Sequence, residues 1–302
     1  MSKDLDSYIS KDHADKNNFD KFGNLYADAM KEFLIPFPST SLDMFPIFNK
    51  STGGFRPREF SILCGSTGSG KTTLIANWSA SLITQGISHF VASVETGHTD
   101  FIKRVISCLA DENWNTGEVV PLEKLKKFQM QYGDMIRKAE TYLSLYDNRF
   151  SVTELMSEIA LAVKTKNIKI AFIDNLNFFM EVKAATETIQ EMDRVIHELI
   201  IFCKRIDVHV VMVMHPKKTE SGRVESEFDI KGSSTAVQES HNIFLFNRVK
   251  REWVDPLGDI EQSDREIKIS KMRRRGMSIG KSIILKTSNG VRYFERGAYE
   301  LT

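Results

Sequence analysis

The chain has 302 residues, of which 41% are apolar and 27% charged; these values are ordinary for a globular protein with one large domain or two small ones. A net charge of +1 excludes a generally basic nucleic-acid coat, so any nucleic acid must bind at local patches. The first six residues are polar and acidic, unlike a signal peptide, and no apolar run approaches the length of a membrane span. We therefore expect a cytoplasmic protein with no membrane partner.

The three cysteines, Cys64, Cys108 and Cys203, are far apart in apolar surroundings and form no CxxC pair. This spacing argues against a zinc site or a disulfide framework. We expect free core thiols in a reducing compartment.

An amphipathic helix is expected near the start of the chain. Apolar side chains recur at helical spacing and end at the prolines of 36–38; they are Phe19, Phe22, Tyr26, Met30 and Phe33. We assign residues 1–40 to an N-terminal arm that carries this linker helix, and residues 41–302 to a second domain. The apolar face of the helix either folds back onto its own domain or docks on a neighbouring subunit.

A phosphate-binding loop follows the apolar run 60–64 and precedes the helix-compatible run 73–78. Glycines allow the backbone N–H groups to point at a polyphosphate, and the helix N-terminus adds partial positive charge. Lys71 can reach the outer phosphates, and the hydroxyl of Thr72 can ligate Mg²⁺. The residues expected to bind a nucleoside triphosphate are Gly65, Ser66, Thr67, Gly68, Ser69, Gly70, Lys71, Thr72 and Thr73.

Strand-like and helix-like segments alternate after this loop. Strands are expected at 87–94, 142–147, 168–173 and 208–214, and helices at 101–109, 122–140, 151–164 and 189–203. Ser151 and Glu154 are expected to form a capping box at the start of the third of these helices. Four further strand-like runs cover 242–246, 266–270, 282–285 and 291–294. The alternation predicts an α/β fold with a mostly parallel, doubly wound sheet flanked by helices.

Three polar residues stand where predicted strands end, and ligands bind at that edge of open α/β sheets. Asp174 has the position of a carboxylate that holds Mg²⁺. The next residue, Asn175, cannot take a proton, so Glu95 is the best placed base for an attacking water, unless it is a surface ion-pair residue. His215 either senses the outer phosphate or is a structural histidine.

Two basic segments are candidates for binding a polyanion. Lys217 and Lys218 open a polar loop that runs to Arg223, although an isolated lysine pair is usually only solvated. The run 271–275, which contains Lys271 and Arg273, can bind nucleic acid or another subunit's phosphate, or form a charged surface turn.

Five segments together resemble the DnaB-type (superfamily 4) ring helicases, with the mitochondrial Twinkle helicase and the helicase half of phage primase–helicases most similar. They stand in the order and at nearly the spacings of that family: Gly54-Phe55-Arg56-Pro57, the phosphate loop, Ile173-Asp174-Asn175-Leu176, His215-Pro216-Lys217-Lys218 and Lys271-x-Arg273-x-x-Gly276. The resemblance implies a RecA-like fold and a homo-oligomeric ring, commonly a hexamer, with ATP or another NTP at each subunit boundary. It also implies that the helix of the arm is the linker between subunits.

The resemblance implies roles for individual residues. Glu95 takes the position of the catalytic base, His215 that of the phosphate sensor, and Lys271 and Arg273 those that reach into the neighbour's site. Near Thr287, where relatives often carry an aromatic that packs on the base, this chain has none, and Arg248 is expected to contribute instead.

We expect an NTP-dependent DNA helicase that moves on single-stranded DNA in replication. The chain shows no primase or zinc-binding segment, so a separate primase and polymerase are the expected partners, as in a phage or another compact replication system. Two alternatives are a RecA-like recombinase that forms filaments, and a DNA-dependent ATPase that does not unwind.

Overall fold

The computed structural model describes residues 22, 26, 30, 38–144, 151–175, 185–217, 223–231, 234–254, 260–274 and 278–300. The chain divides into two compact units, Met1–Pro38 and Ser39–Thr302, and we describe each by itself. In the first unit Phe22, Tyr26 and Met30 are helical, and the other residues expected in the linker helix lie outside the described ranges.

The described residues of the second unit form a sheet of nine strands in the order β3-β2-β4-β5-β1-β6-β7-β8-β9. The strands are β1 (Phe60–Cys64), β2 (Phe90–Ser93), β3 (Tyr142–Leu143), β4 (Ile170–Asp174), β5 (His209–Met214), β6 (Asn242–Val254), β7 (Ile260–Met272), β8 (Lys281–Ser288) and β9 (Arg292–Glu300). The first six strands in that order pair in parallel, as expected for a doubly wound sheet.

The last three strands depart from the parallel pattern, because β7, β8 and β9 each pair antiparallel with the strand before them. Only three residues separate β8 from β9, and a parallel connection needs a crossover of a dozen or more. Asn289 and Gly290 both have positive φ, 49° and 73°, which suits a tight hairpin turn. The sheet is therefore mixed, with its parallel part around the phosphate loop.

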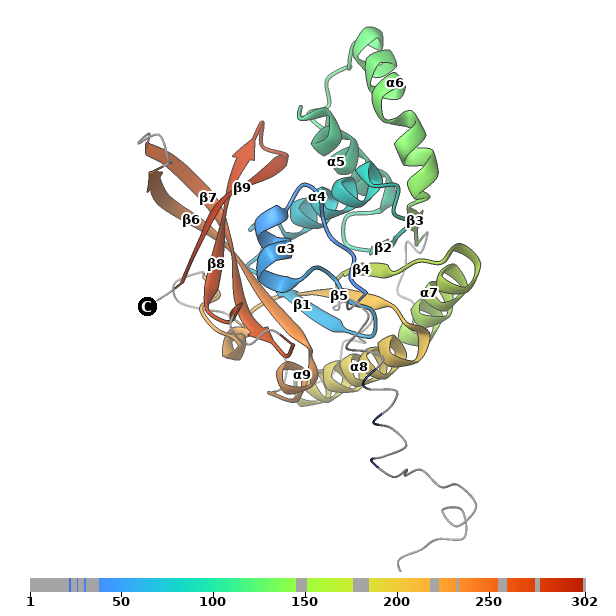
Figure 1. Cartoon of the computed structure of the whole chain (residues 1–302), viewed down its shortest axis with the longest axis vertical. Helices are drawn as coiled ribbons and strands as arrows, with labels where there is room; N and C mark the ends of the chain where they lie inside the picture. Colours follow the sequence, from blue (N-terminus) through green and yellow to red (C-terminus); the bar gives the residue numbers. More distant parts are fainter. Residues whose placement is uncertain are drawn as a thin grey trace, which may run out of the picture. The chain divides into compact units, whose positions relative to one another are not determined.

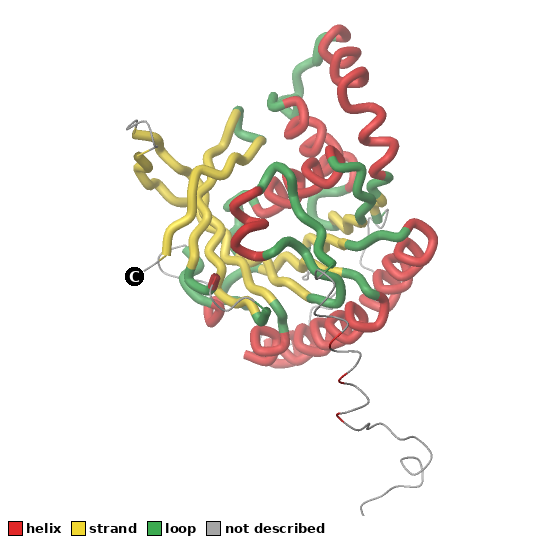
Figure 2. Tube along the Cα trace, viewed as in Figure 1, coloured by secondary structure: helices red, strands yellow, loops and turns green. Residues whose placement is uncertain are grey.

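Helices cover both faces of the parallel part (Figures 1 and 2). The described helices are α3 (Pro46–Thr52), α4 (Lys71–Thr84), α5 (His98–Ala110), α6 (Leu122–Ala139), α7 (Val152–Lys166), α8 (Ala185–Ile206) and α9 (Ser234–Glu239). Alternate residues of β1 enter different cores: Ile62 packs with α7 and α8, whereas Leu63 packs with α3, α4 and α5. Within the described ranges, no helix is both long and apolar enough to span a membrane.

The start of α7 and the cysteines agree with the expectations, whereas α3 is an additional helix. The cap of α7 is confirmed, since Ser151 Oγ accepts from the Glu154 N–H and Glu154 Oε2 accepts from the Ser151 N–H. The cysteines are free and buried, also as expected. Helix α3 was not expected, although Pro46 in its first turn and the left-handed Gly53 after its end are typical helix boundaries.

Strand lengths were the least accurate expectation. Strand β2 covers 90–93 instead of 87–94, so Glu95 lies in the turn that follows the strand. Of the strand expected at 142–147, β3 covers the first two residues, and 145–150 lie outside the described ranges. Strands β6 and β7 have 13 residues each, far longer than the apolar runs that indicated them.

Two histidines are buried within the fold with the same hydrogen-bonding pattern. Nδ1 of His209 lies 2.6 Å from the Arg56 carbonyl and its Nε2 lies 2.9 Å from Ser61 Oγ. In His89 the corresponding distances are 3.1 Å to the Ile87 carbonyl and 2.6 Å to a serine hydroxyl. A carbonyl only accepts, so Nδ1 carries the proton and Nε2 accepts from the hydroxyl. Burial lowers the pKa of His89 to about 4 and that of His209 to about 3.

These histidines predict acid sensitivity. Both rings take up protons in the unfolded chain below about pH 6.5, but not in the folded chain until near pH 4 or 3. Their contribution to the free energy of unfolding is therefore complete above pH 6.5 and is lost as the pH falls, by about 2 kcal/mol per ring at pH 5. Chemical denaturation at pH 7 and pH 5 should show a smaller loss in His89→Gln and in His209→Gln than in the wild type. Equal losses in all three proteins would contradict neutral buried rings.

Candidate nucleotide site

The loop 65–70 connects β1 to α4, which begins at Lys71. Gly70 is the N-cap of α4, with a φ of 99° that residues with a side chain rarely adopt. A Cβ at this position would lie 2.4 Å from the hydroxyl oxygen of Tyr293. The backbone of the loop thus turns tightly onto the helix N-terminus, an arrangement that favours binding of an anion.

Lys71 is buried at the mouth of this loop. Its Nζ donates to the carbonyls of Gly65 and Ser66 at 2.7 and 3.0 Å. Burial lowers the pKa of Lys71, while the charge of Asp174 acts in the opposite direction. The two carbonyls hold the ammonium where a phosphate oxygen, a stronger acceptor because it is charged, can compete for it.

Asp174 and Thr72 form the part of the site that suits Mg²⁺. The Thr72 hydroxyl donates to Asp174 Oδ2 at 2.6 Å, although the two residues are 102 positions apart. Asp174 Oδ1 is buried without a hydrogen-bond partner among the described residues. Burial raises the pKa of Asp174 to about 6, and a nearby cation would favour the charged form. An orphaned carboxylate oxygen beside a hydroxyl is a fitting donor set for this hard cation.

The described residues contain no group of three or more His, Cys, Asp and Glu side chains that could hold a metal ion alone. This agrees with the usual coordination of Mg²⁺ in nucleotide sites, where one or two protein ligands bind the ion and water and phosphate oxygens fill the remaining positions. The two candidates for these protein ligands are Thr72 and Asp174.

Glu95, Asn175 and His215 meet next to Asp174. The Nδ2 atom of Asn175 donates to Glu95 Oε2 and lies 3.0 Å from His215 Nε2. Glu95 Oε2 and His215 Nε2 are 3.8 Å apart. Burial, and then the charge of Lys71, lower the pKa of His215. Sequence reasoning placed the outer two residues together but treated Asn175 only as a missing base, whereas it lies between them.

Arg265 on β7 is a site residue that the sequence did not reveal. Its Nε donates to the Ser69 carbonyl at 2.8 Å, so it holds the phosphate loop from the antiparallel side of the sheet. Tyr293 on β9 reaches the same loop at Gly70. Neither residue belongs to a recognisable local pattern. Only the successive pairing of β6, β7, β8 and β9 brings them to the loop.

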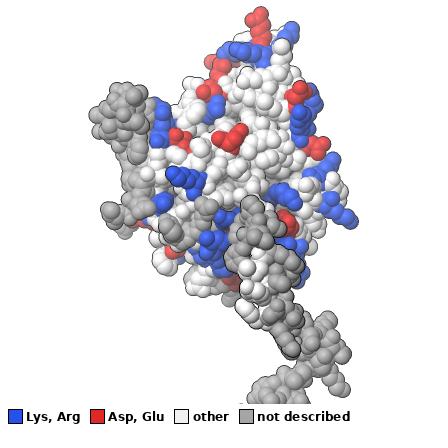
Figure 3. Space-filling model, viewed as in Figure 1, with Lys and Arg blue, Asp and Glu red and all other residues white. Residues whose placement is uncertain are grey.

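The residues expected to bind DNA have intramolecular partners where they are described. Lys217 Nζ donates to the Phe228 carbonyl at 3.0 Å. Arg223 donates to Glu266 Oε1 at 2.8 Å, and Lys218 lies outside the described ranges. Basic and acidic side chains are interspersed on the face seen in Figure 3, in keeping with the small net charge.

Lys271 and Arg273 lie at the opposite edge of the sheet from the phosphate loop. Strand β7 runs antiparallel to β6, so its end lies beside the start of β6, where the Arg273 N–H donates to the His241 carbonyl at 3.0 Å. The His241 N–H in turn donates to the Phe60 carbonyl, at the start of β1. The side chains of Lys271 and Arg273 donate to carbonyls at the end of α9. The five residues of β1, about 16 Å, separate these cations from their own phosphate loop.

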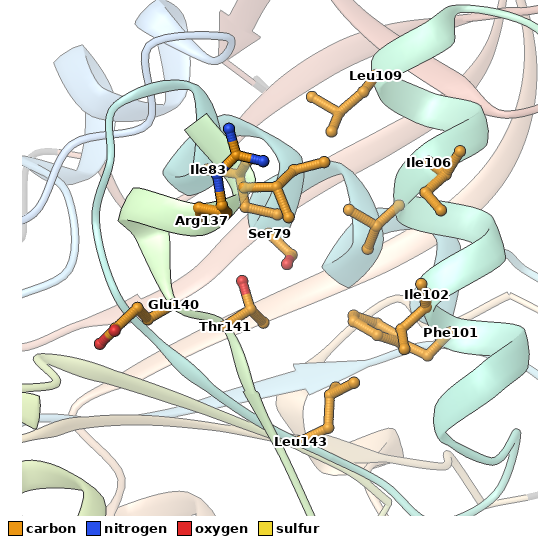
Figure 4. Close-up of a pocket in the computed structure, with 12 residues that line it drawn as sticks. Ser79, Ile83, Phe101, Ile102, Ile106, Leu109, Arg137, Glu140, Thr141 and Leu143 are labelled. Atoms are coloured by element: carbon orange, nitrogen blue, oxygen red, sulfur yellow. The ribbon is translucent and has the colours of Figure 1, made fainter. Parts of the chain in front are cut away.

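A pocket of about 430 Å³ lies away from this chemistry, between α4, α5, α6 and β3 (Figure 4). Its lining is largely apolar and includes Ile83, Phe101, Ile106, Leu109 and Leu143. It contains no phosphate-loop residue, so we assign the nucleotide to the loop and not to this pocket.

Arg265 provides a test of the site geometry. Arg265→Ala removes the hydrogen bond to Ser69 and should weaken ATP binding about tenfold, the value of one charge-assisted hydrogen bond. Titration with a fluorescent ATP analogue measures the change. Arg296→Ala, at an exposed position on β9, is the matched control and should bind like the wild type. An unchanged affinity in Arg265→Ala would show that the loop does not need this contact.

Comparison with known proteins agrees with this geometry. Residues 43–292 match the DnaB-like helicase C terminal domain family. A solved structure described as a DnaB-like replicative helicase and its interactions with primase is 16% identical, with a TM-score of 0.71 over 93% of this chain and 69% of that one. A second solved structure, described as an ATPase domain, is 17% identical, with a TM-score of 0.71 over 94% of this chain and 100% of that one, so both share the RecA-like fold. The chain therefore belongs to the DnaB-like helicase C-terminal domain family and is an NTP-dependent helicase.

Proposed function

We propose that this helicase works as a homohexameric ring in the cytoplasm, pulls single-stranded DNA through its centre and uses Mg²⁺–ATP. A separate primase and polymerase are the proposed partners, and the related structure described with primase supports the first of them. The assignments of individual residues below belong to this proposal.

The proposed ring rests on the positions of Arg273 and Lys71. Arg273 and Lys71 lie at opposite ends of β1, so Arg273 reaches a phosphate only on another copy of the chain. A contact between the end of β7 on one copy and the phosphate loop of the next is head-to-tail, and such contacts form a ring when the rotation between copies closes. Each nucleotide then lies at a subunit boundary.

The reaction is an attack of water on the γ-phosphate. Lys71 and the neighbour's Arg273 and Lys271 offset the charge on the phosphate oxygens, and Glu95 orients the water. Thr72 and Asp174 would hold Mg²⁺, which supplies further positive charge at the phosphates. His215 responds to the state of the phosphate, a role supported by its distance of 3.8 Å from Glu95.

Coupling to DNA passes through the loop after β5. Pro216 forms a bridge with Ile230, and the Lys231 N–H donates to the His215 carbonyl at 3.1 Å. Movement of His215 therefore moves the base of the loop that carries Lys217 and Lys218. Those cations, with Arg223, would contact the phosphates of the DNA strand, after Arg223 exchanges Glu266 for the strand.

The arm supports assembly between copies. Phe22, Tyr26 and Met30 are four residues apart in a helix, which places them on one face, and their exposed fractions are 83%, 52% and 44%. Such a stripe needs an apolar surface, and the pocket between α4, α5 and α6 of a neighbouring copy offers one.

The first test measures ATP hydrolysis with and without single-stranded DNA, on protein whose mass is determined by mass photometry. We expect a species of about six subunits whose turnover rises with DNA, and strand separation on a forked duplex. Phe22→Ser with Tyr26→Ser should lower the mass of the assembly, because the apolar stripe is lost.

Two other outcomes would favour different functions. Open filaments that exchange strands would indicate a recombinase. DNA-stimulated hydrolysis without strand separation would indicate an ATPase that only loads onto DNA. Turnover by a monomer that ignores DNA would remove the assigned roles of Lys217, Lys218 and Arg273.

Subunit mixing tests whether Arg273 acts on a neighbour. Arg273→Ala alone should bind ATP nearly normally and lose turnover, and Lys71→Ala alone should also be inactive. In a mixture, some boundaries combine the intact phosphate loop of an Arg273→Ala subunit with the intact arginine of a Lys71→Ala subunit, so part of the activity should return. A mixture as inactive as its components would contradict action on a neighbour.

A further inference from the structure

Asn175 occupies the middle of the site in both sequence and space. Strand β4 lies between β2 and β5, and Asn175 directly follows β4, while Glu95 and His215 follow the two flanking strands. The side chain of Asn175 is buried, with 2% of the residue exposed. Its Nδ2 contacts both Glu95 Oε2 and His215 Nε2. One amide nitrogen thus connects the base candidate to the sensor candidate.

The chemistry of the three groups makes this connection directional. A carboxylate only accepts hydrogen bonds, so the amide nitrogen of Asn175, and not its oxygen, must face Glu95. The second N–H of the same nitrogen then meets Nε2 of His215, which must accept and therefore carries no proton. His215 is thus the tautomer with its proton on Nδ1 when Asn175 bridges the two residues.

This arrangement cannot persist when His215 binds a phosphate oxygen through Nε2, because that atom must then donate. The proton moves to Nε2, and the contact with the Asn175 amide nitrogen becomes one between two donors. Asn175 must turn, and its hold on Glu95 changes with it. Movement of the loop bridged to Ile230 would act on His215 in the same way.

We propose that Asn175 is a positioning residue that couples Glu95 to His215 and keeps Glu95 from orienting water until the phosphate and the DNA loop release it. This inference rests on the proposed function, because it assumes that Glu95 and His215 act in hydrolysis. It adds a residue that restrains hydrolysis in the absence of DNA.

The measurable quantity is the ratio of turnover with single-stranded DNA to turnover without it. In Asn175→Ala the restraint is absent, so turnover without DNA should rise, and the ratio should fall about tenfold, the value of one charge-assisted hydrogen bond. The KM for ATP should stay within about twofold, because Asn175 does not hold the nucleotide. A residue that only fills space would lower both rates together and leave the ratio unchanged.

Two further variants separate coupling from packing. Asn175→Asp keeps the shape of the side chain but has no N–H donor for Glu95, so its ratio of turnover with DNA to turnover without DNA should fall as in Asn175→Ala. A ratio equal to that of the wild type would overturn the proposal. Asn49→Ala is the matched control, because the Asn49 side chain in α3 also makes two hydrogen bonds, in its case with the backbone of Leu42, and contacts none of the site residues named above. It should lower the melting temperature without changing the ratio.

The coupling and the proposed function fail in different ways. Wild-type hydrolysis that ignores DNA would overturn the proposed function. A stimulated wild type with an equally stimulated Asn175→Ala would overturn only the coupling.

Nitrogen NMR of histidine-labelled protein tests the bridge without any DNA, with the His215 signals assigned by their absence in His215→Gln. In nucleotide-free wild type, Nε2 of His215 should be unprotonated, and its signal should move in Asn175→Ala because a donor is lost. A protonated Nε2 in the wild type, or a signal that stays in place, would overturn the bridge.

Discussion

The parallel pairing of β2, β4, β5 and β1 is the constraint on which the candidate site depends. Parallel strands in register end at the same edge of the sheet, so residues from distant parts of the chain meet there, namely Thr72, Glu95, Asp174 and His215. The hydrogen bond between Thr72 and Asp174 joins the first turn of α4, directly after the phosphate loop, to the end of β4. A shift of one residue in any of these pairings would turn the side chains to the opposite face and separate the groups.

Burial at this edge shifts the pKa values of two charged groups, the proposed phosphate ligand Lys71 and the proposed metal ligand Asp174, in opposite directions. It lowers the pKa of Lys71 and raises that of Asp174, because each loses the water that stabilises its charge. Each group therefore interacts strongly with any opposite charge that enters. A triphosphate with its cation would supply both signs at once, so the proposed ligand suits a buried site with these two charges.

The antiparallel strands have two roles at opposite ends of the sheet. At one end Arg265 and Tyr293 support the phosphate loop from within the same chain. At the other end Lys271 and Arg273 are held against the end of α9, remote from that loop. Because β7 is antiparallel to β6, a single strand carries both a residue for its own nucleotide and the cations proposed for the next one.

The sequence by itself determined the phosphate loop, its strand and helix, the alternation of the α/β region and the family. These features depend on contiguous residues: glycines at fixed spacing, apolar periodicity and the Ser151 cap. It also identified Glu95, Asp174 and His215 as neighbours, because each follows an apolar run and parallel strands share an edge.

Only the tertiary structure decided what lies between and beside these residues. Asn175 seemed chemically inert in the sequence, and its bridging position arises from the spacing of three strands. Arg265 and Tyr293 belong to no local pattern, and the extent and antiparallel direction of β6 to β9 depend on pairing between strands rather than on the apolar runs inside them. These contacts join residues 40 to 196 positions apart and leave no local signal, so only the folded chain shows them.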